Sequence, residues 1–301
     1  MLDSTLTGGI EAGGTKFLCM VGSDPQHIEA EARFHTEEPE KTLEQVIQFF
    51  KPYADAGQIS RMGVGSFGPL DLDPGSPTYG FITSTPKPGW RKVDLMGTLK
   101  RRLGLSVVMD TDVNVAGFGE RLWGAGKGYD PLLYLTIGTG IGGGYIKDGK
   151  PLHGLLTPEM GHIHVQHDLK TDPFEGACPF HGDCFEGLAS GAALSRRFGE
   201  EADNIPDDDP IWELEAGYIA NALVAYILIL SPKRIILGGG VMHRRFLLPG
   251  IIKNVQQGLN GYLDHPSLLD GIKDYIVFPG LGDRSGIFGA IALAKHNSES
   301  T

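Results

Sequence analysis

Cysteine is scarce in this chain of 301 residues, which contains only three. Three cysteines cannot build a disulfide framework, so the sequence excludes the small disulfide-rich folds of secreted proteins. Hydrophobic residues make up 41% of the chain and charged residues 21%, close to the average of globular proteins. A chain of this length and composition can bury an apolar core without cross-links.

Positive charge is also in short supply. Lys and Arg number 26 against 37 for Asp and Glu, and the formal net charge is −11. The sequence therefore argues against a nucleic-acid-binding protein, which needs a basic face. The longest apolar run, residues 222–230 with a tyrosine inside it, is too short to cross a bilayer, and residues 1–5 show no secretory signal. We therefore expect a cytoplasmic protein with no nucleic-acid or membrane partner.

Glycine, with 44 residues, is about twice as frequent as usual and gathers in three clusters, at residues 8–14, 138–144 and 238–240. The first two clusters lie in similar patterns of strand, glycine turn with threonine, and return strand, over residues 8–22 and 132–147. Their likeness suggests an internal duplication. Because predicted helices alternate with predicted strands, the fold class is α/β. Helices are expected over residues 38–53, 113–123, 211–230, 246–263 and 285–295, and further strands over 61–65, 107–110 and 234–237.

The second glycine cluster satisfies G-x-G-x-x-G over residues 138–143. A dinucleotide site needs a helix directly after these glycines, whereas residues 145–147 continue as a strand, which disfavours a nicotinamide-dependent oxidoreductase. Glycine turns can also hold phosphate oxygens with consecutive backbone N–H groups, helped here by the hydroxyls of Thr15 and Thr139. The alternative is a pair of ordinary hairpins. Three clusters at strand ends favour a nucleotide site.

Two carboxylates, Asp110 and Asp112, follow a predicted strand and open a predicted helix. Phosphoryl transfer to a hydroxyl needs a carboxylate that orients the attacking oxygen and takes its proton. Sites of α/β proteins gather at this edge of the sheet. Asp112 is therefore a candidate general base, with Asp110 as the competing residue. A simple N-cap role for Asp112 explains the residues alone equally well.

A Cys-x2-His-x2-Cys spacing is formed by Cys178, His181 and Cys184. Zinc needs a fourth ligand, and a set without room for water indicates a structural ion. We expect His162 as this ligand, with His164 as the alternative; His167 is a further upstream histidine. Free thiols beside surface histidines are the competing interpretation. A nucleic-acid-binding zinc finger is disfavoured by the net charge of −11.

Three stretches resemble the ROK family of sugar kinases: GIEAGGTK at residues 9–16, DTDVN at 110–114 and TIGTGIGGG at 136–144. GSFGP at 65–69, TPKPGW at 85–90 and the segment 178–191 are similar to the bacterial fructokinases of that family. The resemblance covers residues 8–295. It implies the actin-like ATPase (ribonuclease H-like) fold, with two related α/β domains around a nucleotide cleft. We expect these domains at residues 1–122 and 123–284, the zinc-binding segment 162–184 in the second, and residues 285–301 packed back on the first.

The resemblance further implies an ATP-dependent hexose kinase, with the 6-hydroxyl of fructose as the acceptor, ATP and Mg²⁺ as cofactors, and Zn²⁺ as a structural ion. It assigns the general base to Asp112. ATP is expected at Gly13, Gly14, Thr15, Lys16, Gly138, Thr139, Gly140, Gly142, Gly238, Gly239 and Gly240. The sugar is expected at Thr85, Asn114, Glu159, His162 and Glu186. Zinc is expected at His162, Cys178, His181 and Cys184.

Glu11 stands where other actin-like kinases have an Asp near Mg²⁺, and the resemblance implies that this longer carboxylate holds the metal through water. Two alternatives stay open for the function. One is a kinase for mannose or glucose. The other is a non-catalytic sugar sensor on the same scaffold, although a sensor has no need of a base at Asp112. A homodimer is the expected assembly.

Overall fold

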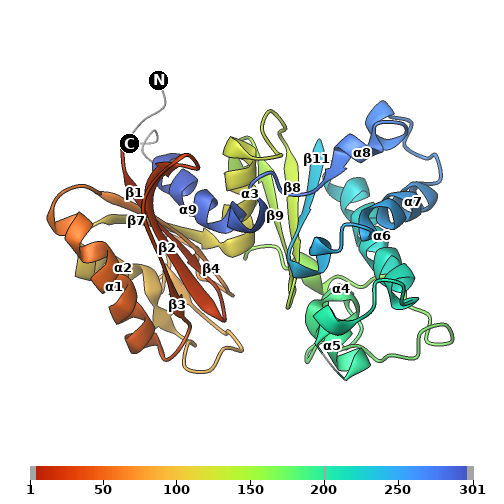
Figure 1. Ribbon diagram of the computed structural model, residues 1–301, viewed down its shortest axis with the longest axis horizontal. Coiled ribbons are helices and arrows are strands. Elements are labelled where there is room, and N and C mark those ends of the chain that lie inside the picture. The colour runs from red at the N-terminus through yellow and green to blue at the C-terminus, as the bar shows by residue number, and fades with distance from the viewer. Residues whose placement is uncertain (1–4, 200, 297–301) are drawn as a thin grey trace. The chain divides into compact units, whose positions relative to one another are not determined.

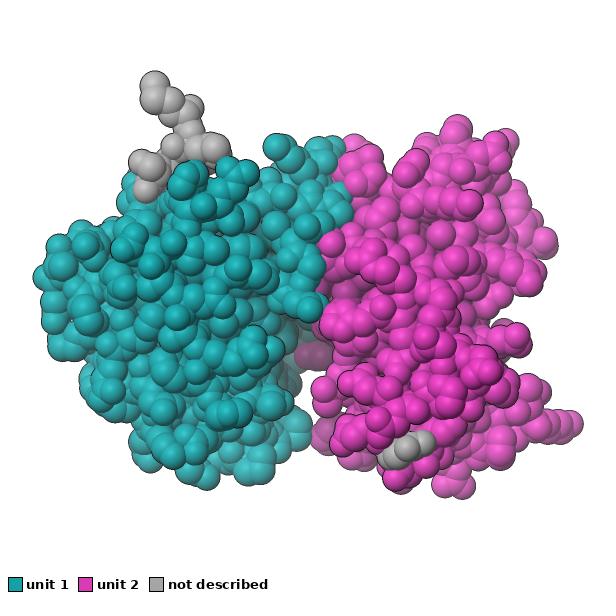
Figure 2. Space-filling view, in the orientation of Figure 1, with its two compact units in different colours: residues 1–128, 149–158, 280–301 teal, residues 129–148, 159–279 magenta. Residues whose placement is uncertain are grey.

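The computed structural model of the protein describes residues 5–199 and 201–296. The chain forms two compact units, which Figure 2 shows in different colours. Unit 1 consists of residues 1–128, 149–158 and 280–301, and unit 2 of residues 129–148 and 159–279. The division expected after residue 122 differs from this one, because unit 1 continues to residue 128 and also includes residues 149–158. Residues 297–301 of the expected final segment lie outside the described residues.

Unit 1 is built around a sheet in the order β3-β2-β1-β4-β7 (Figure 1). β1 runs antiparallel to β2, and β2 antiparallel to β3, whereas β4 is parallel to both β1 and β7. The strand β3 was not expected from the sequence, because polar and apolar residues alternate in it and only one of its faces is sheltered. The strands are β1 (Thr7–Ala12), β2 (Lys16–Asp24), β3 (His27–His35), β4 (Arg61–Ser66) and β7 (Ser106–Thr111).

The helices of unit 1 are α1 (Pro39–Asp55), α2 (Leu95–Leu103), α3 (Asp112–Trp123) and α9 (Ser285–His296). α9 packs against α3, β1 and β4. Its backbone comes so close to β4 that a Cβ on Gly63 would lie 2.0 Å from the carbonyl oxygen of Ala290. The short strands β5 (Phe81–Ile82) and β6 (Val93–Asp94) pair with each other, and β10 (Lys150–Pro151) lies in the second segment of the unit, residues 149–158.

Unit 2 contains the strand order β9-β8-β11-β12. Its strands are β8 (Leu132–Ile137), β9 (Ile141–Lys147), β11 (Arg234–Gly238) and β12 (Ile276–Val277). Its helices are α4 (Phe185–Ala189), α5 (Gly191–Phe198), α6 (Ile211–Leu230), α7 (Leu247–Leu259) and α8 (Ile272–Tyr275). α7 ends four residues earlier than expected, because Asn260 adopts a left-handed conformation with φ 46° that stops the helix.

α6 is apolar over most of its 20 residues, and by length and composition alone it could span a membrane. In the structure it is a core helix of unit 2 that contacts α4 and α7. Trp212, Glu215 and Tyr226 are buried along it. A buried glutamate within the helix fits a protein core better than a lipid environment.

The two sheets repeat one topology, as the two similar hairpins predicted. β2-β1-β4-β7 and β9-β8-β11-β12 each consist of an antiparallel hairpin followed by two parallel strands. The order shared by both repeats is hairpin, helix, strand, helix, strand and final helix; β3, β5 and β6 are additional in the first, and β10, α4, α5 and α8 in the second. By this order α9 is the counterpart of α3, yet both helices lie in unit 1.

A buried carboxylate ties α3 to two other segments of unit 1. Glu120 is fully inaccessible to solvent. Its Oε2 accepts the N–H groups of Ala125 and Gly280 at 2.7 and 2.9 Å. Its Oε1 accepts the N–H of Leu281 at 2.9 Å and the hydroxyl of Ser285 at 2.6 Å. The donors lie where the chain leaves unit 1 after α3 and where it re-enters before α9, so one side chain holds both points.

Candidate active site and metal cluster

The turn between β1 and β2 is supported from one side and exposed on the other. The N–H of Gly13 donates to the carbonyl of Lys16 at 2.9 Å, and the hydroxyl of Thr36 donates to the carbonyl of Gly13 at 2.7 Å. Gly14, Thr15 and Lys16 are exposed. A Cβ on Gly14 would meet no atom of the described residues within 4 Å. The turn is therefore held by hydrogen bonds at Gly13, while Gly14, Thr15 and Lys16 are exposed.

The turn between β8 and β9 is packed by its own unit. The N–H of Gly191, at the start of α5, donates to the carbonyl of Gly138 at 2.7 Å. A Cβ on Gly140 would lie 2.8 Å from Oε2 of Glu186, and the same oxygen accepts the N–H of Ile141 at 2.8 Å. A side chain at position 140 would therefore displace the carboxylate of Glu186 from its hydrogen bond with Ile141.

The other predicted nucleotide residues of unit 2 surround this turn. The carbonyl of Thr139 accepts the N–H of Ala192 at 3.3 Å, and Gly142 lies in β9. Gly238 ends β11, and Gly239 follows it with φ 93° and a Cβ position only 2.4 Å from a backbone oxygen of β8. A Cβ on Gly138 would lie 3.6 Å from the nitrogen of Gly240. The two glycine clusters of unit 2 are therefore neighbours.

Asp112 is the first residue of α3, and it does not cap the helix. The N-cap is Thr111, whose hydroxyl accepts the N–H of Asn114 at 3.3 Å. Oδ1 of Asp112 accepts the N–H of Val113 at 2.9 Å. The interpretation of Asp112 as a simple N-cap is therefore wrong, because the neighbouring threonine fills that position.

Asp110, the competing base, is buried and has a hydrogen bond on each oxygen. Its Oδ1 accepts the side-chain amide of Asn114 and the N–H of Thr111, both at 2.7 Å. Its Oδ2 lies 2.9 Å from Nε2 of His153. This hydrogen bond raises the pKa of His153. Both oxygens of Asp110 are therefore engaged by protein donors. His153 was not among the predicted site residues, because a lone histidine in a loop gives no sequence signal.

Glu11 has the donor chemistry that Mg²⁺ requires. Its Oε2 is buried and has no hydrogen-bond partner among residues 5–199 and 201–296. Burial, and next the charge of Asp112, raise the pKa of Glu11 to about 7, against the lowering effect of Lys16. A Cβ on Gly286 would lie 2.7 Å from the unpartnered oxygen, so this glycine admits the first turn of α9 beside the carboxylate. A divalent cation would favour the charged form of both carboxylates.

The predicted sugar residues fall into two groups. Glu159, His162 and Glu186 lie together in unit 2, where Nε2 of His162 is 3.9 Å from Oε1 of Glu186. Burial raises the pKa of Glu159, and the charge of Glu186 adds to this increase, whereas His162 opposes it. Asn114 and Thr85 belong to unit 1, and the hydroxyl of the buried Thr85 accepts a backbone N–H at 3.2 Å.

A compact group of four potential metal ligands lies in unit 2. The ligand atoms of His162, Cys178, His181 and Cys184 all lie within 4.8 Å of one another. Nδ1 of His162 is 3.8 Å from Sγ of Cys178 and 3.6 Å from Sγ of Cys184. Tetrahedral zinc, with Zn–S of ~2.3 Å and Zn–N of ~2.0 Å, separates a sulfur and a nitrogen ligand by about 3.6 Å. The spacing of these atoms therefore suits one zinc ion.

The two other upstream histidines lie apart from this group. His164 forms a backbone bridge with Cys184, but its side chain is not among the clustered ligand atoms. His167 is 3.0 Å from a carboxylate oxygen of Asp183 through Nδ1 and 3.0 Å from the carbonyl of Asp172 through Nε2. The geometry therefore favours His162 over His164 and His167.

Nothing in the sequence indicated the buried network of ion pairs and hydrogen bonds around Asp172, in the segment that carries the Cys/His cluster. Asp172 is buried and forms an ion pair with both terminal nitrogens of Arg197 on α5. It also accepts the hydroxyl of Tyr218 on α6 at 2.6 Å. Bidentate pairs of this kind fix geometry as well as charge. The cluster-bearing segment is thereby attached to two helices of unit 2.

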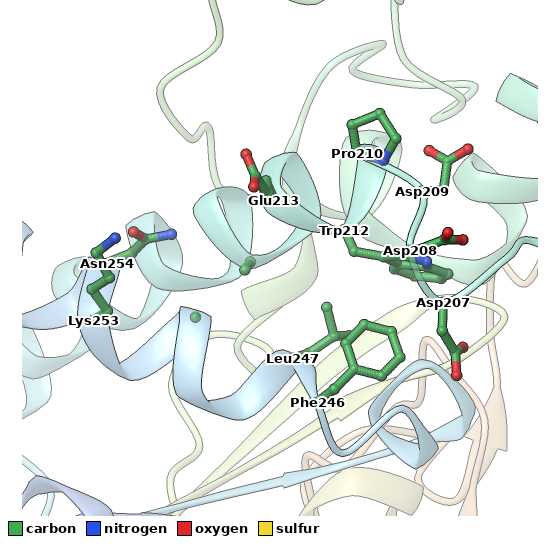
Figure 3. A pocket seen from close by; sticks show the side chains of 12 residues that line it. Asp207, Asp208, Asp209, Pro210, Trp212, Glu213, Phe246, Leu247, Lys253 and Asn254 are labelled. Carbon is green, nitrogen blue, oxygen red and sulfur yellow. The ribbon is translucent and has the colours of Figure 1, made fainter.

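A separate cavity of about 660 Å³ lies in unit 2, between the loop before α6 and the start of α7. Figure 3 shows Asp207, Asp208 and Asp209 on this loop, with Trp212 and Phe246 near them. The residues that line it include none of those expected to bind ATP, sugar or zinc.

Two units with one strand order, each opening with a glycine-turn hairpin, define a duplicated α/β protein. Residues 7–297 match the ROK family, and the chain belongs to that family. A protein of Bacillus subtilis is 50% identical over 289 residues, which cover 96% of this chain and 95% of that protein. The fructokinase of Zymomonas mobilis is 43% identical over 300 residues, which cover 97% of each chain.

Solved structures agree with this assignment. A ROK hexokinase from Thermus thermophilus superposes with a TM-score of 0.79 at 25% identity, over 98% of this chain and 100% of that one. A ROK glucokinase from Streptomyces griseus, solved with glucose and AMPPNP, gives 0.75 at 26% identity over 97% and 99%. The predicted actin-like ATPase fold is confirmed. The nicotinamide-dependent alternative is wrong, because β9 follows the glycines where a dinucleotide site needs a helix.

Proposed function

We propose that this protein is an ATP-dependent hexose kinase that converts D-fructose to fructose 6-phosphate. The observation that carries the proposal is the 43% identity with the fructokinase of Zymomonas mobilis over 97% of both chains. Fructokinases of Pediococcus pentosaceus and Lactococcus lactis are 41% and 43% identical, whereas three glucokinases, of Thermotoga maritima, Halalkalibacterium halodurans and Streptomyces coelicolor, are 27–30% identical. This difference favours fructose over glucose as the acceptor.

ATP is assigned to the glycine turns. In unit 1 the exposed front of Gly14, Thr15 and Lys16 offers backbone N–H groups, a hydroxyl and an ammonium group to phosphate oxygens. In unit 2 we assign it to the turn residues Gly138, Thr139, Gly140 and Gly142 and to Gly238, Gly239 and Gly240. Mg²⁺ would neutralise the charge that develops on the phosphates during transfer. Glu11 fits a role beside this ion because of its unpartnered buried oxygen.

Asp112 is proposed as the general base. It would orient the 6-hydroxyl of fructose toward the terminal phosphate and accept the hydroxyl proton. Its place at the carboxyl edge of the unit 1 sheet, with the capping role taken by Thr111, supports this assignment. The sugar hydroxyls are assigned to Thr85, Asn114, Glu159, His162 and Glu186.

The Cys/His cluster is proposed to hold one structural Zn²⁺. With His162, Cys178, His181 and Cys184 as ligands, four protein atoms complete a tetrahedron and leave no position for water. Nδ1 of His162 faces the thiols, while its Nε2 is directed toward Glu186. The ion would therefore orient an imidazole that also contacts the sugar.

A coupled assay of ADP release tests the function. Purified protein is given ATP and Mg²⁺ with fructose, mannose or glucose in turn. We expect the largest kcat/KM with fructose and a product phosphorylated at the 6-hydroxyl. A larger kcat/KM with mannose or glucose would show that this sugar, and not fructose, is the substrate. Hexose binding without ADP release would indicate a sugar sensor instead.

Metal analysis tests the zinc site with two neighbouring histidines as matched variants. We expect one zinc per chain in the wild type and in His164→Ala, and loss of zinc in His162→Ala. Chelation should weaken the affinity for fructose more than that for ATP. Fully active protein with much less than one zinc per chain would contradict the proposal.

The cellular setting follows from the same chemistry. All three cysteines are free, and Cys178 and Cys184 are proposed zinc ligands, which suits the reducing cytoplasm. We also propose a homodimer. Analytical ultracentrifugation checks this assembly, and a sedimentation coefficient of the monomer at assay concentrations would contradict it.

A further inference from the structure

His153 is a side chain of unit 1 to which the proposed function gives no role. It lies in the segment 149–158, two residues after β10, and its imidazole is 40% exposed. The nearby leucines 155 and 156 are largely exposed as well. His153 is nevertheless directed inward, since its Nε2 lies 2.9 Å from Oδ2 of Asp110, whose side chain is only 6% exposed.

Asp110 in turn shapes the start of α3. Its other oxygen, Oδ1, accepts the side-chain amide of Asn114 and the N–H of Thr111, each at 2.7 Å. Thr111 caps the helix that Asp112 begins. One carboxylate therefore fixes the orientation of the Asn114 amide and the turn that presents Asp112.

A buried carboxylate of this kind needs a hydrogen-bond donor on each of its oxygens. Leaving a buried charge without a partner is unfavourable, and the presence of a second carboxylate two residues away adds repulsion between like charges. The charge of Asp110 contributes to the raised pKa of Tyr79, second to burial. The hydrogen bond to Asp110 is the main cause of the raised pKa of His153.

We propose that His153 is a positioning residue for phosphoryl transfer, which holds Asp110 in place and thereby orients Asn114 and Asp112. The proposal rests on the proposed kinase function. His153 touches neither substrate in this scheme. Without its N–H donor, Asp110 would turn toward solvent, and the amide of Asn114 would lose its acceptor. Sugar binding and proton transfer would then suffer together, whereas ATP binding would not.

Two substitutions at the same position separate the donor from the rest of the side chain. His153→Leu removes the hydrogen bond, and His153→Gln keeps an N–H donor at a similar reach. We expect kcat/KM for fructose to fall about 10- to 100-fold in His153→Leu, with KM for ATP changed less than about threefold. His153→Gln should stay within about fivefold of the wild type, because the donor is retained.

A double-mutant cycle with Asp110→Asn tests whether His153 acts through Asp110. We expect Asp110→Asn and the double variant to have the same kcat/KM within about threefold, because the second change removes nothing further. Leu155→Ala, in the same segment and fully exposed, is the control and should leave the kinetics and the melting temperature unchanged.

Several results would overturn the inference: wild-type kinetics in His153→Leu, equal losses in His153→Leu and His153→Gln, or losses that multiply in the double variant. A merely structural role would lower the melting temperature and raise KM for ATP along with that for fructose. Failure of the proposed function has a different signature, because the wild type itself would then release no ADP with any hexose.

Discussion

The two glycine-turn hairpins occupy equivalent places in two sheets of equal strand order. The surroundings of the glycines in the two turns nevertheless differ. In unit 1, a Cβ on Gly14 would enter open space. In unit 2, a Cβ on Gly140 would meet Glu186 of the same unit at 2.8 Å. A glycine in a turn can therefore admit a ligand or admit the protein's own side chain, and only the structure separates the two.

The repeats also differ in what lies between hairpin and first long helix. In unit 1 the strand β3 leads to α1 with only three residues between them. In the second repeat the segment from Glu159 to the start of α6 carries the Cys/His cluster, α4 and α5. The duplicated sheets thus provide a common scaffold, and an inserted segment provides the residues that we assign to zinc and to most of the sugar contacts.

The largest effect is expected from the carboxylate that unit 1 alone contributes. Asp112→Asn should lower kcat by about 10²–10⁴, while the dissociation constant for fructose changes much less, because the amide cannot accept the hydroxyl proton. Asp110→Asn is the matched variant, and its effect should be clearly smaller. Single-turnover kinetics measure the rate of phosphoryl transfer, and calorimetry measures the dissociation constant for fructose. A variant Asp112→Asn that keeps a tenth of wild-type kcat would assign the base elsewhere.

The next effect concerns the asymmetry between α3 and α9, which are counterparts in the repeats but share unit 1. Glu120→Gln should lower the stability of the protein by about 2–4 kcal/mol, because an amide N–H₂ would face backbone donors that now point at an oxygen. The melting temperature reports this loss. Glu213→Gln on α6 is the control, since its side chain is exposed. Equal melting temperatures for the two variants would show that Glu120 contributes no more than a surface residue.

Much of this comparison could be predicted from the sequence. The spacing of apolar residues predicted both hairpins, because burial of one face imposes that spacing. It also predicted the bounds of α6 as observed and those of α3 to within one residue. Cysteine spacing indicated the Cys/His cluster, since three of its four residues lie within a stretch of seven. The strand β3 and the helix α2 were missed, because their patterns are weak or short.

Other site residues gave no local signal. His153 meets Asp110, and Glu120 meets Gly280, across long stretches of sequence. Such contacts depend on the tertiary fold and leave no motif in a single sequence. Gly286 is similar, because a side chain at this position would collide with the carboxylate of Glu11, which is distant in the sequence.

A pair of equivalent substitutions sharpens the comparison of the hairpins. Gly14→Val should raise KM for ATP about tenfold and leave the melting temperature nearly unchanged, because the side chain enters only the space assigned to phosphate. Gly140→Val should lower the melting temperature as well, since it displaces Glu186. Steady-state kinetics and thermal unfolding measure both effects. An unchanged KM for ATP in Gly14→Val would mean that the unit 1 turn does not bind a phosphate group of ATP.

The smallest expected effect is a dependence of stability on pH, caused by the titration of Glu11 in unit 1. Its pKa is about 7 in the folded protein and 4.5 ordinarily, with burial as the main cause. Between these values the folded state binds more protons than the unfolded state, so stability falls as the pH rises through this window. In protein without Mg²⁺ this loss should amount to about 1–2 kcal/mol between pH 5 and pH 7.

Glu11→Gln tests this prediction, because it keeps the shape of the side chain and removes its titration. Urea unfolding at pH 5 and pH 7 should show a smaller loss of stability in the variant than in the wild type. Asp112→Asn should reduce the loss in part, since the charge of Asp112 is the second cause of the raised pKa. Equal losses in the wild type and in Glu11→Gln would mean that Glu11 is already ionised at pH 5 and that another group of the protein carries the dependence.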